Sequence, residues 1–293
     1  LEFRRVLFRS SDYWLIYYNK DVFDAAGIAY PSNDMTMEDY DALARQLTDT
    51  TYGSQVYGCH YHTWRSAVEL FGILDGKHSI LDGNYDWMIP YYDMILSEED
   101  DGVCQTYTDL STEGLHYSAA FSNGNVAMMN MGSWFISTLI SNLDSGEYDS
   151  SLCGNWGIAS YPHPDGAEAG STIATITGLA VTSASANKDA AFDFVNWVSG
   201  TEGAKVMAST GNFPAIMTDD VINTIAGMAG FPTDESSKEA LNITNAYLEV
   251  PYAENVSEIN SILDTYHTSI MNREVTVEEG VASMNEQVGK ILN

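Results

Sequence analysis

The feature that most constrains the fold is an alternation of short apolar runs with amphipathic helical patterns from Ser11 onward, without a repeat or a low-complexity tract. Residues 13–18 have the length and composition of a buried strand, and the short helical pattern behind them stops at Gly27. Strands that alternate with helices are typical of α/β proteins. A chain of 293 residues with 45% hydrophobic residues can bury a large core in about one to two domains.

A second strand is predicted at residues 125–131, followed by a turn at Gly132 and by a helix that Ser133 caps and that runs through Ile140. This order places Trp134 at the carboxyl end of a strand. Ligands of open α/β sheets bind at that edge, so Trp134 is a candidate contact residue.

Other patterns predict the remaining elements. Thr36 is predicted to cap a helix whose apolar residues recur at helical spacing. A strand at 173–181 leads to a helix at 188–199 that ends at Gly200. The predicted buried stripe of that helix is Ala191, Phe194, Val195 and Val198. The C-terminal part is helical, and its last helix begins at a capping box, Thr276 to Glu279.

Charge excludes several functions. The sequence has 41 Asp and Glu against 12 Lys and Arg, a formal net charge of −29, which argues against binding to nucleic acids or anionic membranes. No apolar run approaches the ~20 residues needed to cross a bilayer.

Catalytic and metal motifs are weak. The hydrolase, zinc-protease, P-loop and dinucleotide motifs do not occur, and residues 82–87 depart from a calcium loop because Trp87 stands where glycine is required. His60 and His62 would share a face of a strand, but no third ligand is in view. We therefore predict no catalytic residue, no metal site and no cofactor. The acidic residues still leave room for a glycosidase pair of carboxylates.

Cysteines and the N-terminus leave questions open. Cys59, Cys104 and Cys153 are compatible with one disulfide and a free thiol, or with three reduced thiols. Residues 1–10 hold three of the twelve basic residues and lack the features of a signal peptide, so we interpret them as a non-native segment. The alternative is a genuine amphipathic strand.

Several separated segments share a resemblance to one family. They are LIYYNKDVF at 15–23, GNVAMMNMGSW at 124–134, GLAVTSASANKDAAFDF at 178–194, GNFP at 211–214 and the Thr276 box. In order and spacing they resemble the extracellular solute-binding proteins of ATP-driven (ABC) sugar importers, the branch that includes maltose-binding protein.

The resemblance implies a bilobal α/β fold, the type II periplasmic-binding-protein-like fold, with the first lobe largely missing. Residues 12–173 and 218–293 would form the second lobe, and residues 175–217 a fragment of the first. In the family, the strand that carries Tyr-Asn-Lys follows a long stretch of the first lobe, in whose place residues 1–10 stand here.

The resemblance also implies a ligand and its contacts. Sugars present C–H faces and hydroxyl edges, so a selective site needs aromatic platforms and fixed polar groups. The Gly-x-Trp turn makes Trp134 the first platform, and a looser alignment adds two more aromatic contacts, Tyr61 and Trp64. Three weaker candidates are Asn130, which alternates with buried neighbours, and Thr177 and Gly178, which lie on the strand near the hinge, where a small residue lets a ligand approach the backbone. Asn130 is expected to point to the mouth of the cleft.

The implied function is capture of a sugar or oligosaccharide between two lobes by a monomer, which presents it to an ABC permease. The protein would be extracellular, either as a membrane-anchored lipoprotein or free in the periplasm. If the first lobe is incomplete, this chain would bind its sugar weakly or not at all. The alternatives are a carbohydrate-active hydrolase, the same fold with a peptide, amino acid or metal ligand, and an adhesive surface protein.

Overall fold

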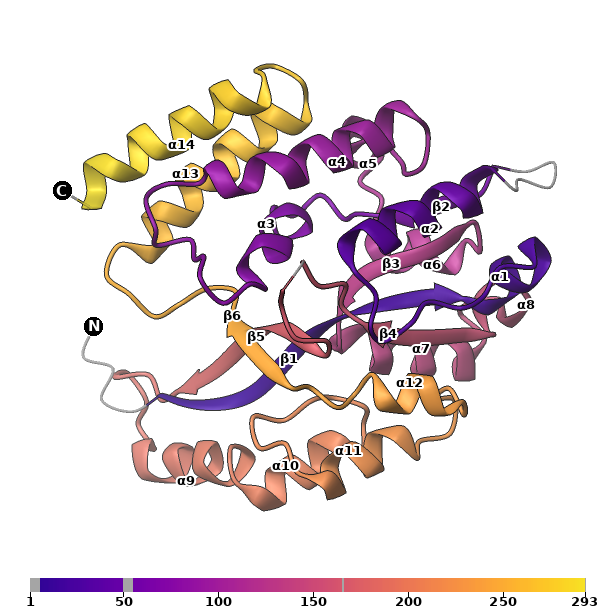
Figure 1. Ribbon diagram of the computed structural model, residues 1–293. Helices are drawn as coiled ribbons and strands as arrows, with labels where there is room; N and C mark the ends of the chain where they lie inside the picture. The colour runs from indigo at the N-terminus through magenta and orange to yellow at the C-terminus, as the bar shows by residue number, and fades with distance from the viewer. Residues whose placement is uncertain (1–5, 50–54, 165, 293) are drawn as a thin grey trace.

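A computed structural model describes residues 6–49, 55–164 and 166–292, and one long strand organises it (Figure 1). The inner part of β1 (Val6–Asn19) pairs antiparallel with β3 (Val126–Gly132) on one side and with β4 (Trp156–Ser160) on the other. Its outer part pairs antiparallel with β5 (Ser171–Ala180), with a register shift between Phe8 and Ser10. The strand therefore belongs to both halves of the sheet.

Two parallel pairs complete the sheet, whose order is β2-β3-β1-β5-β6 with β4 beside β1. β2 (Tyr57–His60) pairs with β3, and β6 (Asn245–Leu248) pairs with β5. The α/β class predicted from the alternation of strands and helices is confirmed.

Helices cover the sheet in groups (Figure 1). α3 (Ser66–Ile73), α4 (Ile89–Asp100), α13 (Val256–Met271) and α14 (Val277–Leu292) pack together near β2 and β3. On the opposite side, α9 (Lys188–Val198) packs along β1 and β5, and α10 (Thr201–Ala208) connects α9 to α11 (Asp219–Ala226). The other helical elements are α1 (Lys20–Ala26), α2 (Met37–Asp49), η1 (Asp86–Met88), α5 (Tyr107–Glu113), α6 (Tyr117–Ser122), α7 (Trp134–Ser145), α8 (Ser150–Cys153) and α12 (Glu235–Glu239).

Three predicted helix caps agree with the structure. Gly27 closes α1 in the left-handed region at φ 67°, which glycine adopts without strain. At the start of α2, Thr36 Oγ1 accepts from the Asp39 N–H at 3.1 Å, and the Asp39 carboxylate accepts from the Thr36 N–H. Thr276 and Glu279 form the same reciprocal pair before α14. These local signals are reliable because both partners lie within one turn.

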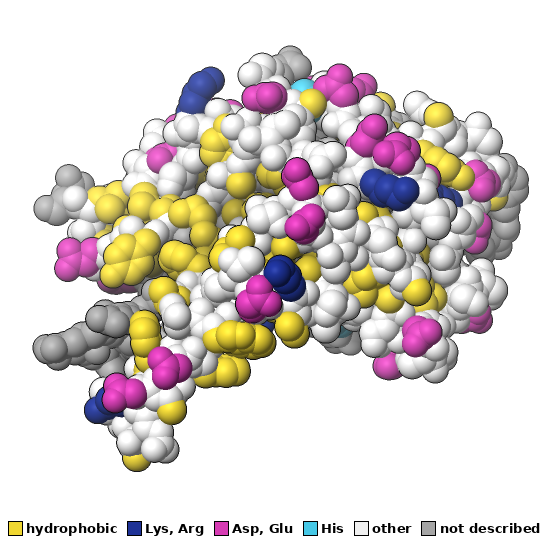
Figure 2. All heavy atoms as spheres, turned by 90° about the horizontal axis from the view of Figure 1, so that it is seen from below, with side chains coloured by type: hydrophobic (Ala, Val, Ile, Leu, Met, Phe, Trp, Pro, Cys, Tyr) yellow, Lys and Arg dark blue, Asp and Glu magenta, His cyan; other side chains and the backbone are white. Residues whose placement is uncertain are grey.

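One prediction is corrected at the outer half of the sheet, and another stays a prediction. Residues 6–10 continue β1 and pair with β5, which agrees with the alternative of a genuine strand but does not test whether residues 1–10 are native. The expected buried stripe of α9 is wrong at Phe194, which is 62% exposed, whereas Val195 is buried. α9 turns only its Val195 side to the sheet, and no described element covers the Phe194 side. Figure 2 shows apolar side chains exposed on this face.

None of the helices in the described part of the chain combines the length and the apolar character that a membrane span requires.

Candidate functional site: an aromatic cluster beside a polar pocket

Three tryptophan rings meet where β1, β3 and the loop before α3 converge. The Trp134 ring lies 5.5 Å from that of Trp14 and 6.3 Å from that of Trp64, centroid to centroid. Tyr117 and His62 lie edge-on to Trp64 at 5.7 and 4.6 Å. We call these five residues the aromatic cluster. Trp14 is buried, Trp134 is half-buried and Trp64 is 42% exposed, so the last two form its accessible face.

The position of Trp134 follows from the predicted strand, turn and helix. β3 is buried throughout and ends at Gly132, and Trp134 is the first residue of α7. Its indole lies back over Gly132, where an added Cβ would come within 2.1 Å of the ring. The Gly-x-Trp sequence therefore has a steric reason: only glycine leaves room for the ring in this orientation.

Replacing Gly132 with alanine is expected to push the Trp134 ring out of the aromatic cluster, because a Cβ and the indole cannot share the space. Such overpacking costs about 1–3 kcal/mol of stability and should change the tryptophan fluorescence. Gly289→Ala in α14 is the matched control, since its Cβ would meet no atom within 4 Å. Equal fluorescence and stability in both variants would contradict the steric role of Gly132.

Ser133 has a different task from the one predicted. It stands at the start of α7, but its side chain makes no capping bond. Its hydroxyl donates to Asp12 Oδ1 at 2.9 Å and accepts from the Tyr13 N–H at 3.2 Å. Burial raises the pKa of Asp12, and the hydrogen bonds from Ser133 and Ser10 oppose that rise. Ser133 thus ties the turn before Trp134 to β1.

A polar pocket of about 330 Å³ opens beside Trp64. Trp64, Arg65, Glu69, Glu249, Asn260, Asp264 and His267 are among the residues that line it. The volume falls within the range that proteins use for small ligands. The pocket joins an aromatic face to a set of hydrogen-bonding groups.

Arg65 organises one wall of this pocket and is only 6% exposed. Its guanidinium donates to Asp264 Oδ1 at 2.9 Å and to Asn260 Oδ1 at 2.6 Å, and it pairs with Glu69 one turn along α3. Glu69 is 2% exposed. The arginine therefore fixes α3 to α13 and neutralises a buried carboxylate.

Glu249 connects the pocket to the aromatic cluster. Its carboxylate accepts a hydrogen bond from the Thr175 hydroxyl, and that hydroxyl accepts from Trp14 Nε1 at 3.2 Å. Burial raises the pKa of Glu249, while the hydrogen bonds from Thr175 and Trp14 oppose the rise. A chain of three side chains thus holds a carboxylate at the pocket wall.

The six predicted contact residues lie in different parts of the structure. Trp134 and Trp64 lie together in the aromatic cluster. Tyr61 is instead a core residue, 6% exposed. The expectation that Asn130 points to the cleft mouth is wrong: it is 1% exposed and donates to the Tyr161 hydroxyl at 3.2 Å.

Thr177 and Gly178 lie on the outer half of β5, opposite Ser10 and Phe8, and neither lines this pocket. Asn130 is buried because β3 is covered on both faces. Tyr61 directly follows β2 and packs against Tyr40 and Phe71 in the core.

Sequence reasoning missed Trp14, Arg65, Thr175 and Glu249. Trp14 lies inside the apolar run at 13–18 and could not be distinguished from core. Arg65 carried a signal, since it follows Trp64 directly in a chain with only 12 basic residues. Thr175 and Glu249 are 74 residues apart, so only the fold brings them together.

His267, which lines the pocket, is expected to make stability dependent on pH. Its Nδ1 lies 3.0 Å from the Tyr92 hydroxyl, and its pKa is lowered to about 3, first by burial and then by the charge of Arg65. The unfolded chain has a histidine pKa of about 6.5 and so binds the proton more tightly. The stability that neutral His267 contributes is therefore complete above about pH 6.5 and is lost progressively as the pH falls toward 3.

We expect His267 to account for about 2 kcal/mol of the stability lost between pH 7.5 and pH 5. The figure follows because pH 5 lies about 1.5 units below the histidine pKa of the unfolded chain, and each unit corresponds to about 1.4 kcal/mol. Urea unfolding of the wild type and of His267→Asn at both pH values measures this, since asparagine can still bond to Tyr92. The variant should lose about 2 kcal/mol less than the wild type over this interval. Equal losses would show that His267 does not titrate in this way.

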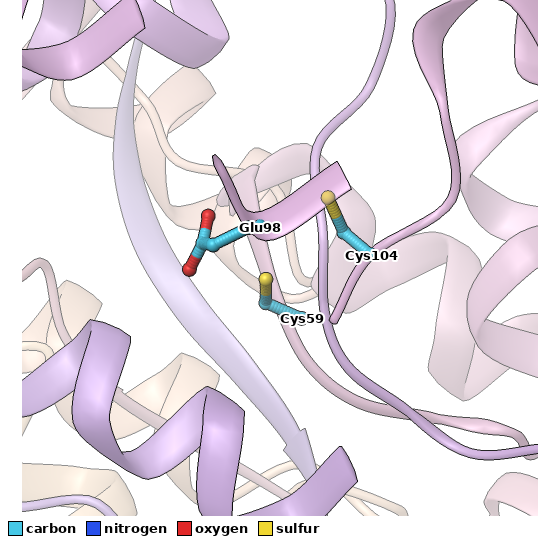
Figure 3. Close-up of side chains that lie close together, drawn as sticks. All are labelled: Cys59, Glu98 and Cys104. Atoms are coloured by element: carbon cyan, nitrogen blue, oxygen red, sulfur yellow. The ribbon is translucent and has the colours of Figure 1, made fainter. Parts of the chain in front are cut away.

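A second group of polar side chains lies in the core, away from this pocket. Cys59, Glu98 and Cys104 bring two sulfur atoms and a carboxylate within 4.8 Å of one another (Figure 3). Burial raises the pKa of Glu98 to about 8, and the nearby Tyr61 hydroxyl opposes the rise. Cys153 lies elsewhere, and all three cysteines are buried as free thiols. No other group of three potential metal ligands occurs among the described residues.

Comparisons with known proteins agree on one family. The sequence model of the bacterial extracellular solute-binding proteins matches residues 6–205. A sugar transporter from Rhizobium etli, solved in an open conformation, is 48% identical with a TM-score of 0.88, and the match covers 97% of this chain and 71% of that one.

More distant structures share the fold. An ABC substrate-binding protein from Listeria monocytogenes in complex with cycloalternan is 22% identical, with a TM-score of 0.78 over 98% of this chain and 71% of that one. A solute-binding protein from Thermotoga lettingae bound with α-D-tagatose is 18% identical, with a TM-score of 0.72 over 99% and 73%. No curated protein matches this sequence.

Proposed function

The chain belongs to the bacterial extracellular solute-binding proteins, and from that premise we propose that it is the carbohydrate-binding component of an ABC importer. It captures a sugar or oligosaccharide outside the cytoplasm and delivers it to a membrane permease. The similarity to a sugar transporter of Rhizobium etli supports the choice of ligand. In this proposal no bond of the sugar is made or broken.

The observation that carries the proposal is the accessible face formed by Trp64 and Trp134 next to the polar pocket. An indole face stacks on the C–H face of a sugar ring, and the neighbouring carboxylate and amide oxygens accept hydrogen bonds from its hydroxyls. Glu249 and Asn260 supply such acceptors at the pocket wall. A metal site would need a different lining, with several histidine or carboxylate ligands converging on one point.

The action we propose is closure of two lobes around the sugar. Residues 12–173 and 218–293 make up one lobe and residues 175–217 belong to the other, with β1 and β5 passing between them. Closure requires that the sugar binds the closed state more tightly than the open one. The protein acts as a monomer, held at the membrane by a lipid anchor or free in the periplasm.

The charges around the pocket predict an uncharged sugar. Its lining holds three acidic side chains, Glu69, Glu249 and Asp264, against one basic side chain, Arg65, a formal balance of 1 − 3 = −2. A uronic acid or a sugar phosphate would bring a further negative charge into this surrounding, which is unfavourable at short range.

A thermal-shift screen of neutral and acidic mono- and oligosaccharides tests the proposal. At a ligand concentration of 100 Kd, binding raises stability by about 2.7 kcal/mol and hence the melting temperature. We expect a rise with at least one neutral sugar and none with the matching uronate. A rise with amino acids, peptides or metal ions but with no sugar would overturn the assignment of the ligand class.

A further inference from the structure

The cluster of Cys59, Glu98 and Cys104 is assembled by the backbone around it. Cys59 lies in β2, Glu98 near the end of α4 and Cys104 in the turn that follows. The Cys59 N–H donates to the carbonyl of Val103 at 3.4 Å, and the Val103 N–H donates to the carbonyl of Glu98 at 2.8 Å. These bonds bring the strand and the turn side by side and hold three potential ligand atoms within 4.8 Å of one another (Figure 3).

Glu98 is the unusual member of this cluster. It is fully buried, and neither oxygen of its carboxyl group has a hydrogen-bond partner of good geometry, although Tyr61 and Asp41 lie close enough to influence its pKa. The hydroxyls of Tyr40 and Tyr61, which lie nearby, are also buried without a partner. Buried polar groups in proteins are almost always satisfied, so three such groups close together favour the binding of a partner at this site.

We propose that Cys59, Cys104 and Glu98 bind one thiophilic divalent cation, for which Zn²⁺ is the best match. Two thiolates and a carboxylate are a donor set that zinc accepts, whereas Ca²⁺ and Mg²⁺ require oxygen ligands alone. The cation satisfies the carboxylate of Glu98. Its charge also offsets most of the three negative charges of the deprotonated ligands.

The distances within the cluster are close to those of a zinc site. Zinc–sulfur bonds of about 2.3 Å in a tetrahedron place two sulfur atoms about 3.8 Å apart. The three potential ligand atoms lie within 4.8 Å of one another, which is close to the spacing that a shared ion requires. A water molecule, or the nearby phenol group of Tyr40 or Tyr61, would complete the tetrahedron. Because Cys59 and Cys104 are at most 3% exposed, the ion enters while the chain folds and has a structural role.

The proposal differs from a disulfide between the same cysteines. Formation of a disulfide would need an oxidant that takes two electrons from the two thiols, and it would leave the Glu98 carboxylate without a partner. A cation engages all three groups. The wide separation of Cys59 and Cys104 along the chain also explains why the sequence shows no zinc motif.

The test is the metal content of the full chain produced in zinc-supplemented medium and purified without chelators. Elemental analysis by mass spectrometry should find about one zinc per chain in the wild type and in Cys153→Ser, the matched control for loss of a buried thiol. We expect Glu98→Gln and Cys59→Ser to contain at least about tenfold less. Circular dichroism shows which variants fold. The zinc content of the wild type tests the proposal by itself, whether or not the variants fold.

Cadmium gives a second, spectroscopic readout that does not depend on sugar binding. Chain produced with Cd²⁺ should show the ultraviolet charge-transfer band of cadmium thiolate, and Cys59→Ser should lack it. Two results would overturn the proposal. One is a wild-type chain with three titratable thiols and no stoichiometric metal. The other is a peptide map that shows a Cys59–Cys104 disulfide.

Discussion

Replacing Trp134 with alanine is expected to reduce the affinity for the cognate neutral sugar by about seventyfold. If the indole removes about 100 Å² of apolar surface from water in the complex, its loss costs about 2.5 kcal/mol. The effect is large because Trp134 and Trp64 together form the accessible face of the aromatic cluster, and Trp134 is also held in place by Gly132 and Trp14. Calorimetric titration of wild type and variant measures it.

Trp197→Ala is the matched control for this experiment. Trp197 is 48% exposed and lies on α9, outside the aromatic cluster, so the same change of side chain should leave sugar affinity unchanged. If Trp134→Ala keeps the wild-type affinity, the assignment of the platform is wrong. If both variants lose affinity equally, the loss reflects general destabilisation.

Replacing Arg65 with alanine is expected to destabilise the fold by about 3–5 kcal/mol, because it leaves the buried carboxylate of Glu69 without its counter-charge. The change also removes the bonds that fix Asn260 and Asp264 in α13. Asp264 is 62% exposed and can be solvated, so Glu69 carries most of the cost. Urea unfolding at neutral pH gives the difference in the free energy of unfolding.

A double variant separates charge from packing at this position. Arg65→Met combined with Glu69→Met removes both charges and keeps most of the buried volume, and such exchanges of a buried ion pair are often neutral or stabilising. We expect it to recover most of the stability that Arg65→Ala loses. A double variant as unstable as Arg65→Ala would show that the guanidinium acts through its other hydrogen bonds.

Local sequence signals predicted the strand, turn and helix around Trp134 because each signal and its partner lie within a few residues. The capping pairs of Thr36 with Asp39 and of Thr276 with Glu279 are found as predicted for the same reason. Ser133 shows the limit of such signals. It has the right residue type at the right position, yet its hydroxyl bonds to Asp12, 121 residues earlier in the chain, instead of capping α7.

The rest of the candidate site depends on pairings that no local pattern contains. Asn130 was expected at the cleft because alternation along a strand suggests one open face, but β3 is covered on both faces. Tyr61 was expected there from the family resemblance, but it lies in the core directly after β2. The link from Trp14 through Thr175 to Glu249 joins β1, β5 and the residue after β6. Only the sheet order reveals it.

The central claim is that the face of Trp64 and Trp134 beside the polar pocket holds a carbohydrate without altering it. The most direct measurement is incubation of the purified chain with a neutral oligosaccharide that gives a thermal shift, followed by calorimetric titration and chromatography of the recovered sugar. Saturable binding with one sugar per chain and complete recovery of the intact sugar is the predicted result. Appearance of shorter products that increases with time and protein concentration would contradict the account and indicate a hydrolase.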